Sequence, residues 1–455
     1  MKSKIKYFFL ILLIFSCSKN EFNNSELNED SSIEENSDLI LMKKAQKDVF
    51  KYFFNYAHPF SKLARERIHE NDMSFDENTV TIGGSGFGFL NILMGIENKF
   101  ISRSEGLNHL RTAINFLENA DRFHGAWPHW MNGNTGDVIP FSNFDNGGDI
   151  VETAFLCQAL ICVREYFKDG TDEEKLLSKK ADKLWKEVEW NWYTKGENTL
   201  YWHWSPEFEW QIDFKIEGYN ESLMPYILGA ASPTFPINEQ VFHEGWANNG
   251  NILSSATQYG IATIFDHKGS NQNVGPLFWA HYSFLTLDPR GLSDIYANYW
   301  KVVKNHTEII YQHCISNPNG FLGYSDNCWG LTASYSRKSD GTTGYSAHQP
   351  TNDLGVISPT AALSSFPYTP EKSLKFLKFL YEDSNYKYIG IAGPYDAFSP
   401  HYQWKTQRYL AIDQGTIGPM IENHKTQFFW NLFMNAPEIK QGLIKLGFSS
   451  TQHGF

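Results

Sequence analysis

Residues 149–167 read DIVETAFLCQALICVREYF, and residues 172–192 read DEEKLLSKKADKLWKEVEWNW. Apolar residues lie on nearly every side of the first segment, which predicts a buried helix, whereas the second has one charged and one apolar face, which predicts a surface helix. Two such helices joined by a short link form a hairpin with an inner and an outer member. We expect the fold to be built from hairpins of this kind.

The same alternation of apolar and amphipathic segments continues along the chain. Roughly six inner and outer pairs favour a closed toroid of helical hairpins in one all-α domain, and no fixed repeat period indicates a solenoid. The other buried helices are expected at residues 86–97, 220–231, 275–285, 356–365 and 415–422. The other surface helices are expected at residues 39–56, 105–119, 239–265, 292–313, 370–383 and 427–433.

The N-terminus has the pattern of a bacterial export signal. Residues 1–16 place lysines ahead of an apolar run that is too short to span a membrane. Residues 14–17 resemble a lipobox, in which Cys17 becomes the lipidated first residue; Phe15 is larger than usual there, so a plain signal peptide stays open. Residues 17–40 are acidic and polar, which predicts a disordered tether before a folded domain at residues 41–455. We therefore expect a cell-envelope lipoprotein that touches the membrane only through its lipid.

The composition favours a neutral partner. The formal net charge is −12, and the domain after the tether stays net negative, so it should repel nucleic acids and anionic polysaccharides. Aromatic residues make up 16% of the chain, and aromatic faces that the core does not use can stack on sugar rings. We expect a monomer that binds neutral carbohydrate and needs no cofactor.

Four cysteines lie within the predicted domain. Cys157 and Cys162 are on one expected helix and point to different sides, whereas Cys314 and Cys328 flank a glycine-rich loop and could form a disulfide. Their spacings match no zinc-binding framework.

Carboxylates are concentrated in the loops that enter the expected inner helices. Inner helices of a toroid run parallel, so the loops at their N-termini gather at one end, where a cleft can form. Asp149 and Glu152 also fit a capping box at the start of a helix, an explanation that needs no catalysis but leaves Asp145 without a role. The acids in these loops are Asp145, Asp149, Glu152, Glu217, Glu221, Asp353 and Asp413.

The same loops or their neighbours supply aromatic and histidine side chains. A single tryptophan belongs more often to the core than to a binding site, so the interpretation depends on the clustering of these side chains near the carboxylates. Acids and aromatic faces that converge at one end suit a cleft for a neutral oligosaccharide. The candidate substrate-binding residues are Trp127, Trp130, Trp204, Trp279, His281, Tyr402 and Trp404.

Several sequence blocks resemble the glycoamylase-like domain family. The main one is EGYNESLMPYILG at residues 217–229, followed by SPT at 232–234. The others are PLFWAH at 276–281, DPRG at 288–291, CWGLTAS at 328–334, SPTAA at 358–362, GPYDAF at 393–398, IDQG at 412–415 and MIEN at 420–423. From Asp48 to its C-terminus the chain is most similar, within that group, to glycoside hydrolase family 144, the bacterial β-1,2-glucanases.

The resemblance implies an (α/α)6 barrel and an inverting hydrolase that acts on β-1,2-glucan. Asp145, Asp149, Glu152 and Glu221 match the acidic positions on which that family relies. Related glycoamylase-like domains transglycosylate cyclic glucans with retention, so the resemblance leaves the stereochemistry open. We expect endo action, with exo release of sophorose from β-1,2-glucooligosaccharides as the alternative.

Inverting hydrolysis requires a carboxylic acid beside the leaving oxygen and a carboxylate that activates water about 6.5–9.5 Å away. Asp149 and Glu152 share one helix turn, roughly 5–6 Å apart at Cβ, and cannot easily be that pair. Glu221 has apolar neighbours in the sequence that can raise its pKa, so it is the expected acid. Asp149, before Asp413, is the expected base, while Asp145 and Glu152 would hold hydroxyl groups or tune the water.

Other functions fit the sequence less well. Asp145, Asn146 and Asp149 lack the spacing of a calcium-binding EF-hand, so no metal is expected. Ser346 and His348 lack the Gly-x-Ser-x-Gly turn of a hydrolase triad. A non-catalytic glycan-binding lipoprotein would not need acids on four separate loops, and a polysaccharide lyase would need Arg or Lys where these loops are acidic.

Overall fold

The structure is a computed structural model that describes residues 25–455, with side chains from residue 37 onward. The chain divides into two units, Met1–Ile40 and Leu41–Phe455, and helix α1 (Ser25–Phe54) runs from the first into the second. We expected a disordered tether at residues 17–40; the structure describes α1 from Ser25 onward, and residues 17–24 lie outside the described residues. The expected signal and Cys17 lie outside the described residues.

The unit Leu41–Phe455 is rich in helices, and buried and surface helices alternate in it as the sequence predicted. The buried helices are α2 (Ile82–Glu97), α4 (Ile150–Phe167), α6 (Leu223–Ala231), α8 (Pro359–Leu363) and α10 (Ala411–Thr426). The partly exposed helices are α3 (Arg103–Leu117), α5 (Asp172–Lys186), α7 (Tyr299–Ser316), α9 (Pro370–Lys378), α11 (Phe428–Met434) and α12 (Pro437–Lys445).

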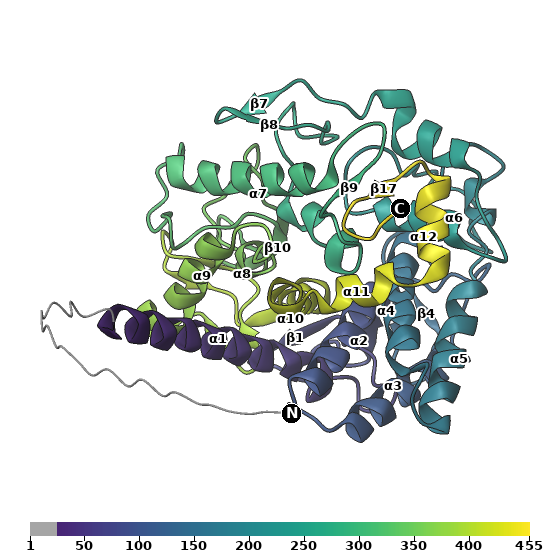
Figure 1. Cartoon of the computed structure of the whole chain (residues 1–455), viewed down its shortest axis with the longest axis horizontal. Helices are drawn as coiled ribbons and strands as arrows, with labels where there is room; N and C mark the ends of the chain where they lie inside the picture. The colour runs from purple at the N-terminus through teal and green to yellow at the C-terminus, as the bar shows by residue number, and fades with distance from the viewer. Residues whose placement is uncertain (1–24) are drawn as a thin grey trace, which may run out of the picture. The chain divides into compact units, whose positions relative to one another are not determined.

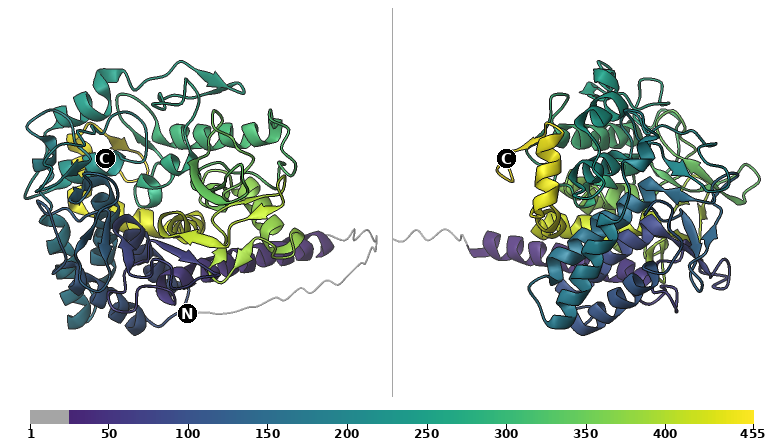
Figure 2. Two further views of the ribbon diagram at one scale, coloured as in Figure 1. Left: turned by 180° about the vertical axis from the view of Figure 1, so that it is seen from behind. Right: turned by 90° about the vertical axis from the view of Figure 1, so that its right-hand side faces the viewer.

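The buried helices pack mainly on one another. α2 contacts α4 and α10, α4 also contacts α6, and α8 contacts α10. Figure 1 shows α2, α4 and α10 next to one another, with α3 and α5 on their outer side. At the C-terminus α11 packs on α4 and α12 on α6, so the yellow end of the chain lies against its blue and teal segments in Figure 2.

Two expected helices are replaced by shorter elements. Residues 239–265 form η2 (Val241–Trp246), η3 (Asn248–Gly250) and a hairpin of β7 (Thr257–Gln258) with β8 (Ile261–Ala262), because Asn249 and Gly250 take positive φ values of 52° and 90° that end a helix. Residues 275–285 form the 3₁₀ turns η4 (Leu277–Ala280) and η5 (Ser283–Leu285). Helix α12 was not expected.

Short strands that the sequence did not predict lead directly into three buried helices. β2 (Thr79–Thr81) precedes α2, β5 (Gly148–Asp149) precedes α4, and β16 (Arg408–Leu410) precedes α10. Their antiparallel partners are β3 (Trp130–Asn132), β6 (His203–Trp204) and β1 (Arg67–His69), and β4 (Val138–Ile139) extends β3. These pairings fix the backbone at the helix N-termini, where the carboxylates were expected.

The remaining strands form separate two-stranded pairs. The longest is the hairpin of β10 (Ala333–Arg337) with β11 (Thr343–Ala347). The shorter pairs are β12 (Ile389–Gly390) with β13 (Gly393–Pro394), β14 (Phe398–Ser399) with β15 (Trp404–Lys405), and β9 (Leu292–Ser293) with β17 (Ser449–Ser450).

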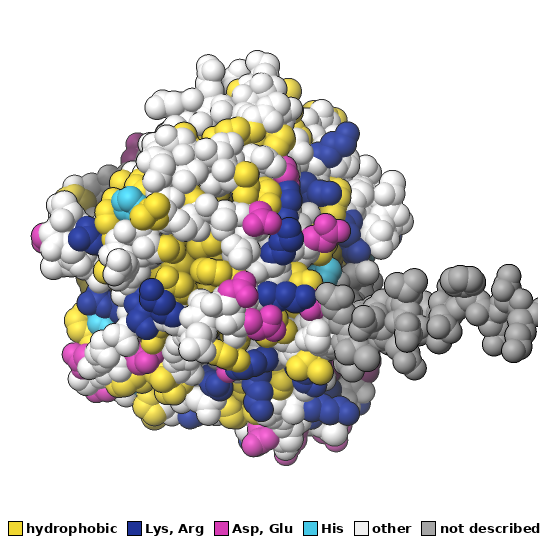
Figure 3. All heavy atoms as spheres, turned by 90° about the vertical axis from the view of Figure 1, so that its left-hand side faces the viewer, with side chains coloured by type: hydrophobic (Ala, Val, Ile, Leu, Met, Phe, Trp, Pro, Cys, Tyr) yellow, Lys and Arg dark blue, Asp and Glu magenta, His cyan; other side chains and the backbone are white. Residues whose placement is uncertain are grey.

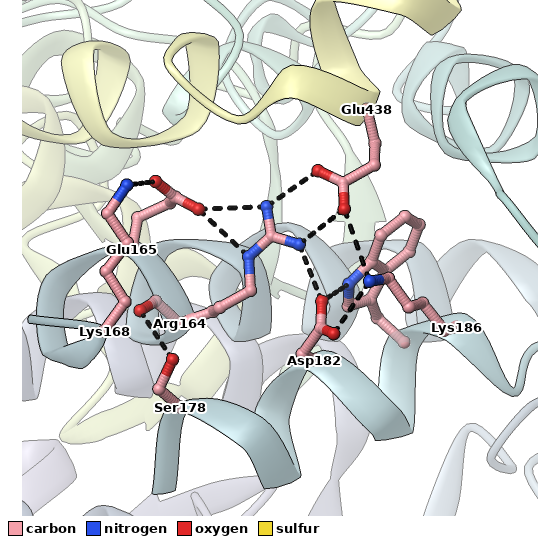
Figure 4. Close-up of polar contacts among 8 residues, drawn as sticks. Arg164, Glu165, Lys168, Ser178, Asp182, Lys186 and Glu438 are labelled. Carbon is pink, nitrogen blue, oxygen red and sulfur yellow. Dashed lines mark hydrogen bonds and ion pairs between the residues drawn. The ribbon is translucent and has the colours of Figure 1, made fainter. Parts of the chain in front are cut away.

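A buried arginine joins three helices through ion pairs. Arg164 on α4 is only 9% exposed and contacts Asp182 on α5 at 2.7 Å and Glu438 on α12 at 3.0 Å. Lys186 contacts the same two carboxylates at 2.7 and 3.3 Å, as Figure 4 shows. The Arg164 guanidinium therefore holds the C-terminal helix α12 against the α4–α5 hairpin.

We predict that Arg164→Met lowers the free energy of unfolding by about 1.5–3 kcal/mol, because it removes the charge-assisted hydrogen bonds of a buried guanidinium while Lys186 still pairs with Asp182 and Glu438. The matched control is Arg111→Met on α3, whose pair with Glu173 at 3.6 Å joins two exposed side chains. That control should lose less than about 1 kcal/mol. Urea unfolding of both variants measures the difference, and equal small losses would contradict the structural role of Arg164.

Two observations concern the surface charge and the length of the helices. On the face shown in Figure 3, acidic and basic side chains are interspersed among hydrophobic ones and form no large patch of one sign. Among the helices of residues 25–455, none has the length and apolarity needed to cross a membrane.

The cysteines correct one expectation. Cys157, Cys162, Cys314 and Cys328 are all buried free thiols, so the disulfide considered between Cys314 and Cys328 is not formed. Burial raises the pKa of Cys314 to about 12, which keeps it a thiol at neutral pH.

Candidate active site

A cavity of about 370 Å³ lies where the loops before α4, α6 and α10 meet the strands β1, β2, β3 and β10. Three carboxylates, Glu66, Glu152 and Glu221, face it together with aromatic side chains. Its lining consists of Glu66, Arg67, Thr81, His129, Trp130, Phe141, Glu152, Phe155, Trp202, Glu221, Phe278, Tyr282, Ala333, Tyr335, Tyr345, Leu410 and Ile412. Acids and aromatic rings therefore do gather at the N-termini of buried helices, as expected, but only some of the residues are those that the sequence analysis named.

Asp149 is the N-cap of α4, as the sequence predicted. Its Oδ1 accepts hydrogen bonds from the backbone N–H groups of Val151 and Glu152, both at 2.9 Å. Its Oδ2 accepts from His129 Nδ1 at 2.9 Å and from Trp202 Nε1 at 3.0 Å. Asp149 is 1% exposed and does not line the cavity, but it holds two residues that do.

Glu152 faces the cavity from the first turn of α4. Its Oε2 accepts a hydrogen bond from the backbone N–H of Gly83 at 2.7 Å instead of completing the expected capping box. A Cβ atom at Gly83 would lie 2.5 Å from that oxygen, so the close approach of α2 and α4 depends on glycine there. Burial, opposed by His129 and reinforced by Asp149, raises the pKa of Glu152 to about 7.

His129 supplies positive charge to this group of acids. Burial disfavours the imidazolium, but Glu152, Asp149 and Glu66 outweigh it and raise the pKa of His129 to about 10. The ring also stacks on Phe141, with centroids 3.9 Å apart. His129 is thus a cation at neutral pH that balances part of the negative charge in the cavity.

Glu221 reaches the cavity from the turn before α6. Among the described residues, no other residue donates a hydrogen bond to its carboxyl group, which leaves that group available to a ligand. Burial raises the pKa of Glu221 to about 7, and the nearby carboxylates Glu152 and Asp149 add to the effect. A carboxyl group that keeps its proton near neutral pH can act as a general acid.

Asp413 and Asp396 form a buried carboxyl pair behind the cavity wall. Tyr282 Oη donates to Asp413 Oδ1 at 3.0 Å, and the backbone N–H of Tyr335 donates to Asp396 Oδ2 at 2.6 Å. The two carboxyl groups interact directly with each other, and Asp413 Oδ2 and Asp396 Oδ1 receive no hydrogen bond from any other described residue. Two carboxyl groups can bond only when a proton lies between them, so the pair holds one proton.

The surroundings of Asp413 and Asp396 raise the pKa of both carboxyl groups. Burial and the Asp396 charge raise the pKa of Asp413 well above its usual range, and burial raises the pKa of Asp396 to about 6. Tyr282, Tyr335 and Tyr345, which are near this pair, all line the cavity. Tyr282 both donates a hydrogen bond to Asp413 and faces the cavity, so its hydroxyl can connect the pair to a ligand in the cavity.

Several lining residues were missed by the sequence analysis. Burial raises the pKa of Glu66, and the charges of His129 and Arg67 oppose that shift. Glu66 precedes β1, a strand too short to leave a periodic pattern, and its chain neighbours gave no signal of a site. Tyr335 and Tyr345 are placed by the pairing of β10 with β11, and Trp202 lies directly before β6; no motif marked them.

The remaining expected site residues lie elsewhere. Asp145 contacts His203 Nε2 at 3.2 Å on the loop before β5. Trp127 and His281 are in the core, hydrogen-bonded to the Leu117 carbonyl and to Ser365 Oγ. Of the expected aromatic residues, only Trp130 lines the cavity. Trp204, Trp279, Tyr402 and Trp404 do not line it.

Known proteins match almost the whole chain. The family model described as "Glycoamylase: Putative glucoamylase" matches residues 213–437. The chain is 38% identical over 432 residues to an exo β-1,2-glucooligosaccharide sophorohydrolase (non-reducing end) from Parabacteroides distasonis. That match covers 90% of this chain, which spans 58% of the length of the relative.

Solved structures agree with these matches. The endo-β-1,2-glucanase from Chitinophaga pinensis, in complex with sophorotriose and glucose, has a TM-score of 0.88 and 51% identity, and the alignment covers 91% of this chain and 99% of that one. The endo-β-1,2-glucanase from Talaromyces funiculosus with sophorose has a TM-score of 0.59 and 12% identity over 88% and 89% of the two chains, which shows a common fold alone.

We predict that Asp396→Asn gains stability relative to the wild type as pH rises. In the unfolded chain both acids ionise near 3.8, but the folded pair keeps a proton, so wild-type stability falls as pH rises through the range between the unfolded and folded pKa values. The asparagine variant has no second carboxyl to ionise. Melting temperatures of both proteins at pH 5 and pH 8 measure the change.

The control for this prediction is Asp353→Asn. Burial opposes ionisation of Asp353, but hydrogen bonds from His313, Gly355 and Tyr324 lower its pKa. The stability that the Asp353 carboxylate contributes is complete above its unfolded pKa, so Asp353→Asn should lose the same amount at pH 5 and at pH 8. An Asp396→Asn difference that does not change with pH would contradict the shared proton.

Proposed function

We propose that this chain, which belongs to the glycoamylase-like family of glycoside hydrolases, hydrolyses β-1,2-linked glucan. The observation that carries the proposal is the Glu221 carboxyl, which faces a cavity lined by acids and aromatic rings, has no donor from another described residue and has a pKa raised to about 7. The bacterial relatives named above, an endo-β-1,2-glucanase and a β-1,2-glucooligosaccharide sophorohydrolase, support the choice of linkage.

Endo action is the first choice. The Chitinophaga endo-glucanase is 51% identical and is covered over 99% of its length, whereas the exo-acting relative is 38% identical and is covered over 58%. Exo release of sophorose is kept as the second candidate because that relative is aligned over 90% of this chain. The two differ in whether chain ends are required for binding.

The proposed mechanism is inverting and uses two carboxyl groups on different segments. Glu221 gives its proton to the glycosidic oxygen as the bond to the anomeric carbon breaks. A water molecule attacks the opposite face of that carbon and passes a proton to the Tyr282 hydroxyl, which passes its own proton to Asp413, while the proton that Asp413 already shares moves to the Asp396 carboxylate. The 3.0 Å bond from Tyr282 to Asp413 and the position of Tyr282 in the cavity lining support this route.

The base role is assigned to Asp413 in preference to Asp149. Each oxygen of Asp149 already accepts two hydrogen bonds, which leaves no lone pair free for a water. Asp149 is instead proposed to position His129 and Trp202 in the cavity wall. Glu152 is proposed to bind a sugar hydroxyl, and Asp145 to hold the loop before β5 through His203.

The (α/α)6 barrel is part of the same proposal. The inner ring would contain α2, α4, α6, the η4–η5 segment, α8 and α10. The contacts of α2 with α4 and α10, of α4 with α6, and of α8 with α10 support this order. The loops before these elements would then form one end of the barrel, which contains the cavity.

The substrate is tested by incubating the purified protein with β-1,2-glucan and with laminarin. We expect new reducing ends from β-1,2-glucan, with products of several lengths at early times, and little or no release from laminarin. Disaccharide alone from the start would support the exo alternative. Equal activity on laminarin would contradict the proposed linkage.

We predict that Glu221→Gln, Asp413→Asn and Tyr282→Phe each lower kcat by about 10²–10⁴-fold with KM little changed, because each removes one step of proton transfer. Asp149→Asn should have the smaller effect on kcat and the larger effect on stability. NMR of early products should show an inverted anomeric configuration. A wild-type rate for Glu221→Gln, or retention of configuration, would refute the assignment.

We also propose that the protein is a monomeric lipoprotein of the cell envelope, anchored through Cys17. The lipobox-like residues 14–17 and the acidic residues behind them support this, and bacterial lipoproteins carry more than one acyl chain, which makes anchoring stable. Membrane fractions of cells should contain the wild type and lose the Cys17→Ala variant. Wild-type protein found in the soluble periplasmic fraction would contradict the anchor.

A further inference from the structure

A second pocket, of about 410 Å³, shares no residue with the lining of the active-site cavity. It lies on the loop between α5 and β6 and on the segments that cover this loop. Its main lining residues are Glu189, Asn191, Trp192, Lys195, Trp210 and Phe235. The proposed reaction uses none of these side chains.

Two tryptophans give this pocket an aromatic wall. Trp192 is 39% exposed, and its ring stacks on the imidazole of His124, with centroids 3.6 Å apart and planes inclined by 13°. The Trp210 ring lies 6.4 Å from that of Trp192 and is inclined to it by 30°. Trp204 meets Trp192 edge-on at 5.7 Å. The wall is therefore held in place by packing before any ligand arrives.

The polar groups of the pocket suit a neutral ligand. The Asn191 side chain is exposed, and within residues 37–455 it has no hydrogen-bond partner, so its amide can both donate and accept. Glu189 accepts a hydrogen bond from His124 Nδ1 at 2.8 Å through one oxygen. Lys195 is paired with Asp213 at 2.8 Å, which leaves no uncompensated positive charge for an anionic ligand.

We infer that Trp192 and Trp210 form a second binding site for a neutral glucan chain, separate from the cavity that contains Glu221. The apolar CH faces of a glucose ring would lie on the indoles, and its hydroxyl groups would bond to Asn191 and Glu189. This inference rests on the proposed function, since the chain bound here is the polymer that is cleaved in the cavity.

A second site has a specific kinetic signature. A long glucan can occupy both sites, and the first contact then raises the local concentration of the chain at the other, whereas a short oligosaccharide occupies only the cavity. Loss of the second site should therefore raise KM for the polymer and leave the kinetics on a short β-1,2-glucooligosaccharide unchanged.

The test compares Trp192→Ala/Trp210→Ala with the control Phe60→Ala. Phe60 is 62% exposed and lines neither pocket. Retardation in native gels that contain β-1,2-glucan is measured in a Glu221→Gln background, and KM is measured with active enzyme. The double variant should lose retardation and show a KM for the polymer raised about two- to tenfold, as expected for lost aromatic contacts. The control should match its parent.

Asn191→Ala guards against misfolding of the double variant, because it removes an exposed amide and no core packing; it should weaken retardation in the same direction. Unchanged retardation and KM in folded variants would overturn the inference, as would equal losses on polymer and short substrate, which would make the pocket part of the active site. If the wild type is retarded by β-1,2-glucan through these residues but does not cleave it, the proposed function fails and the binding site stands.

Discussion

The Asp149 carboxylate joins the segments that build the candidate site. It caps α4, accepts one hydrogen bond from the ring of His129 and another from the indole N–H of Trp202, and lies in the strand pair β5–β6. Those contacts come from three stretches of chain that are far apart in the sequence. A residue whose hydrogen-bonding capacity is fully used by the protein positions other groups, and the groups it positions face the cavity.

The charge balance of the cavity follows from that arrangement. Glu66, Glu152 and Glu221 share a partly dehydrated space with the His129 imidazolium and the Arg67 guanidinium, so three acids face two cations and not all of them can be ionised at neutral pH. This crowding of acids lowers stability, but it gives Glu221 a proton to donate. Active sites commonly contain carboxyl groups with shifted pKa values, one of which acts as an acid and another as a base.

The two aromatic regions illustrate different uses of tryptophan. Trp130 and Trp202 line the cavity beside the acids, while Trp192 and Trp210 form a separate pocket whose polar groups are an amide, a carboxylate and a paired lysine. Trp127 is entirely buried and belongs to the core. The side-chain type is the same in all three settings, so exposure and neighbouring polar groups decide what each tryptophan can do.

The sequence by itself determined the order of buried and surface helices, the N-cap at Asp149, and Glu221 as the expected acid, because these depend on local periodicity and on residues that are neighbours in the chain. The tertiary structure alone brought Glu66 to the cavity, joined Asp396 to Asp413, and used both oxygens of Asp149 within the protein. It also placed Trp127 in the core and built strands of two or three residues, too short to produce a pattern. Burial and long-range hydrogen bonds set the charge and direction of a side chain, and neither is encoded within a few residues of it.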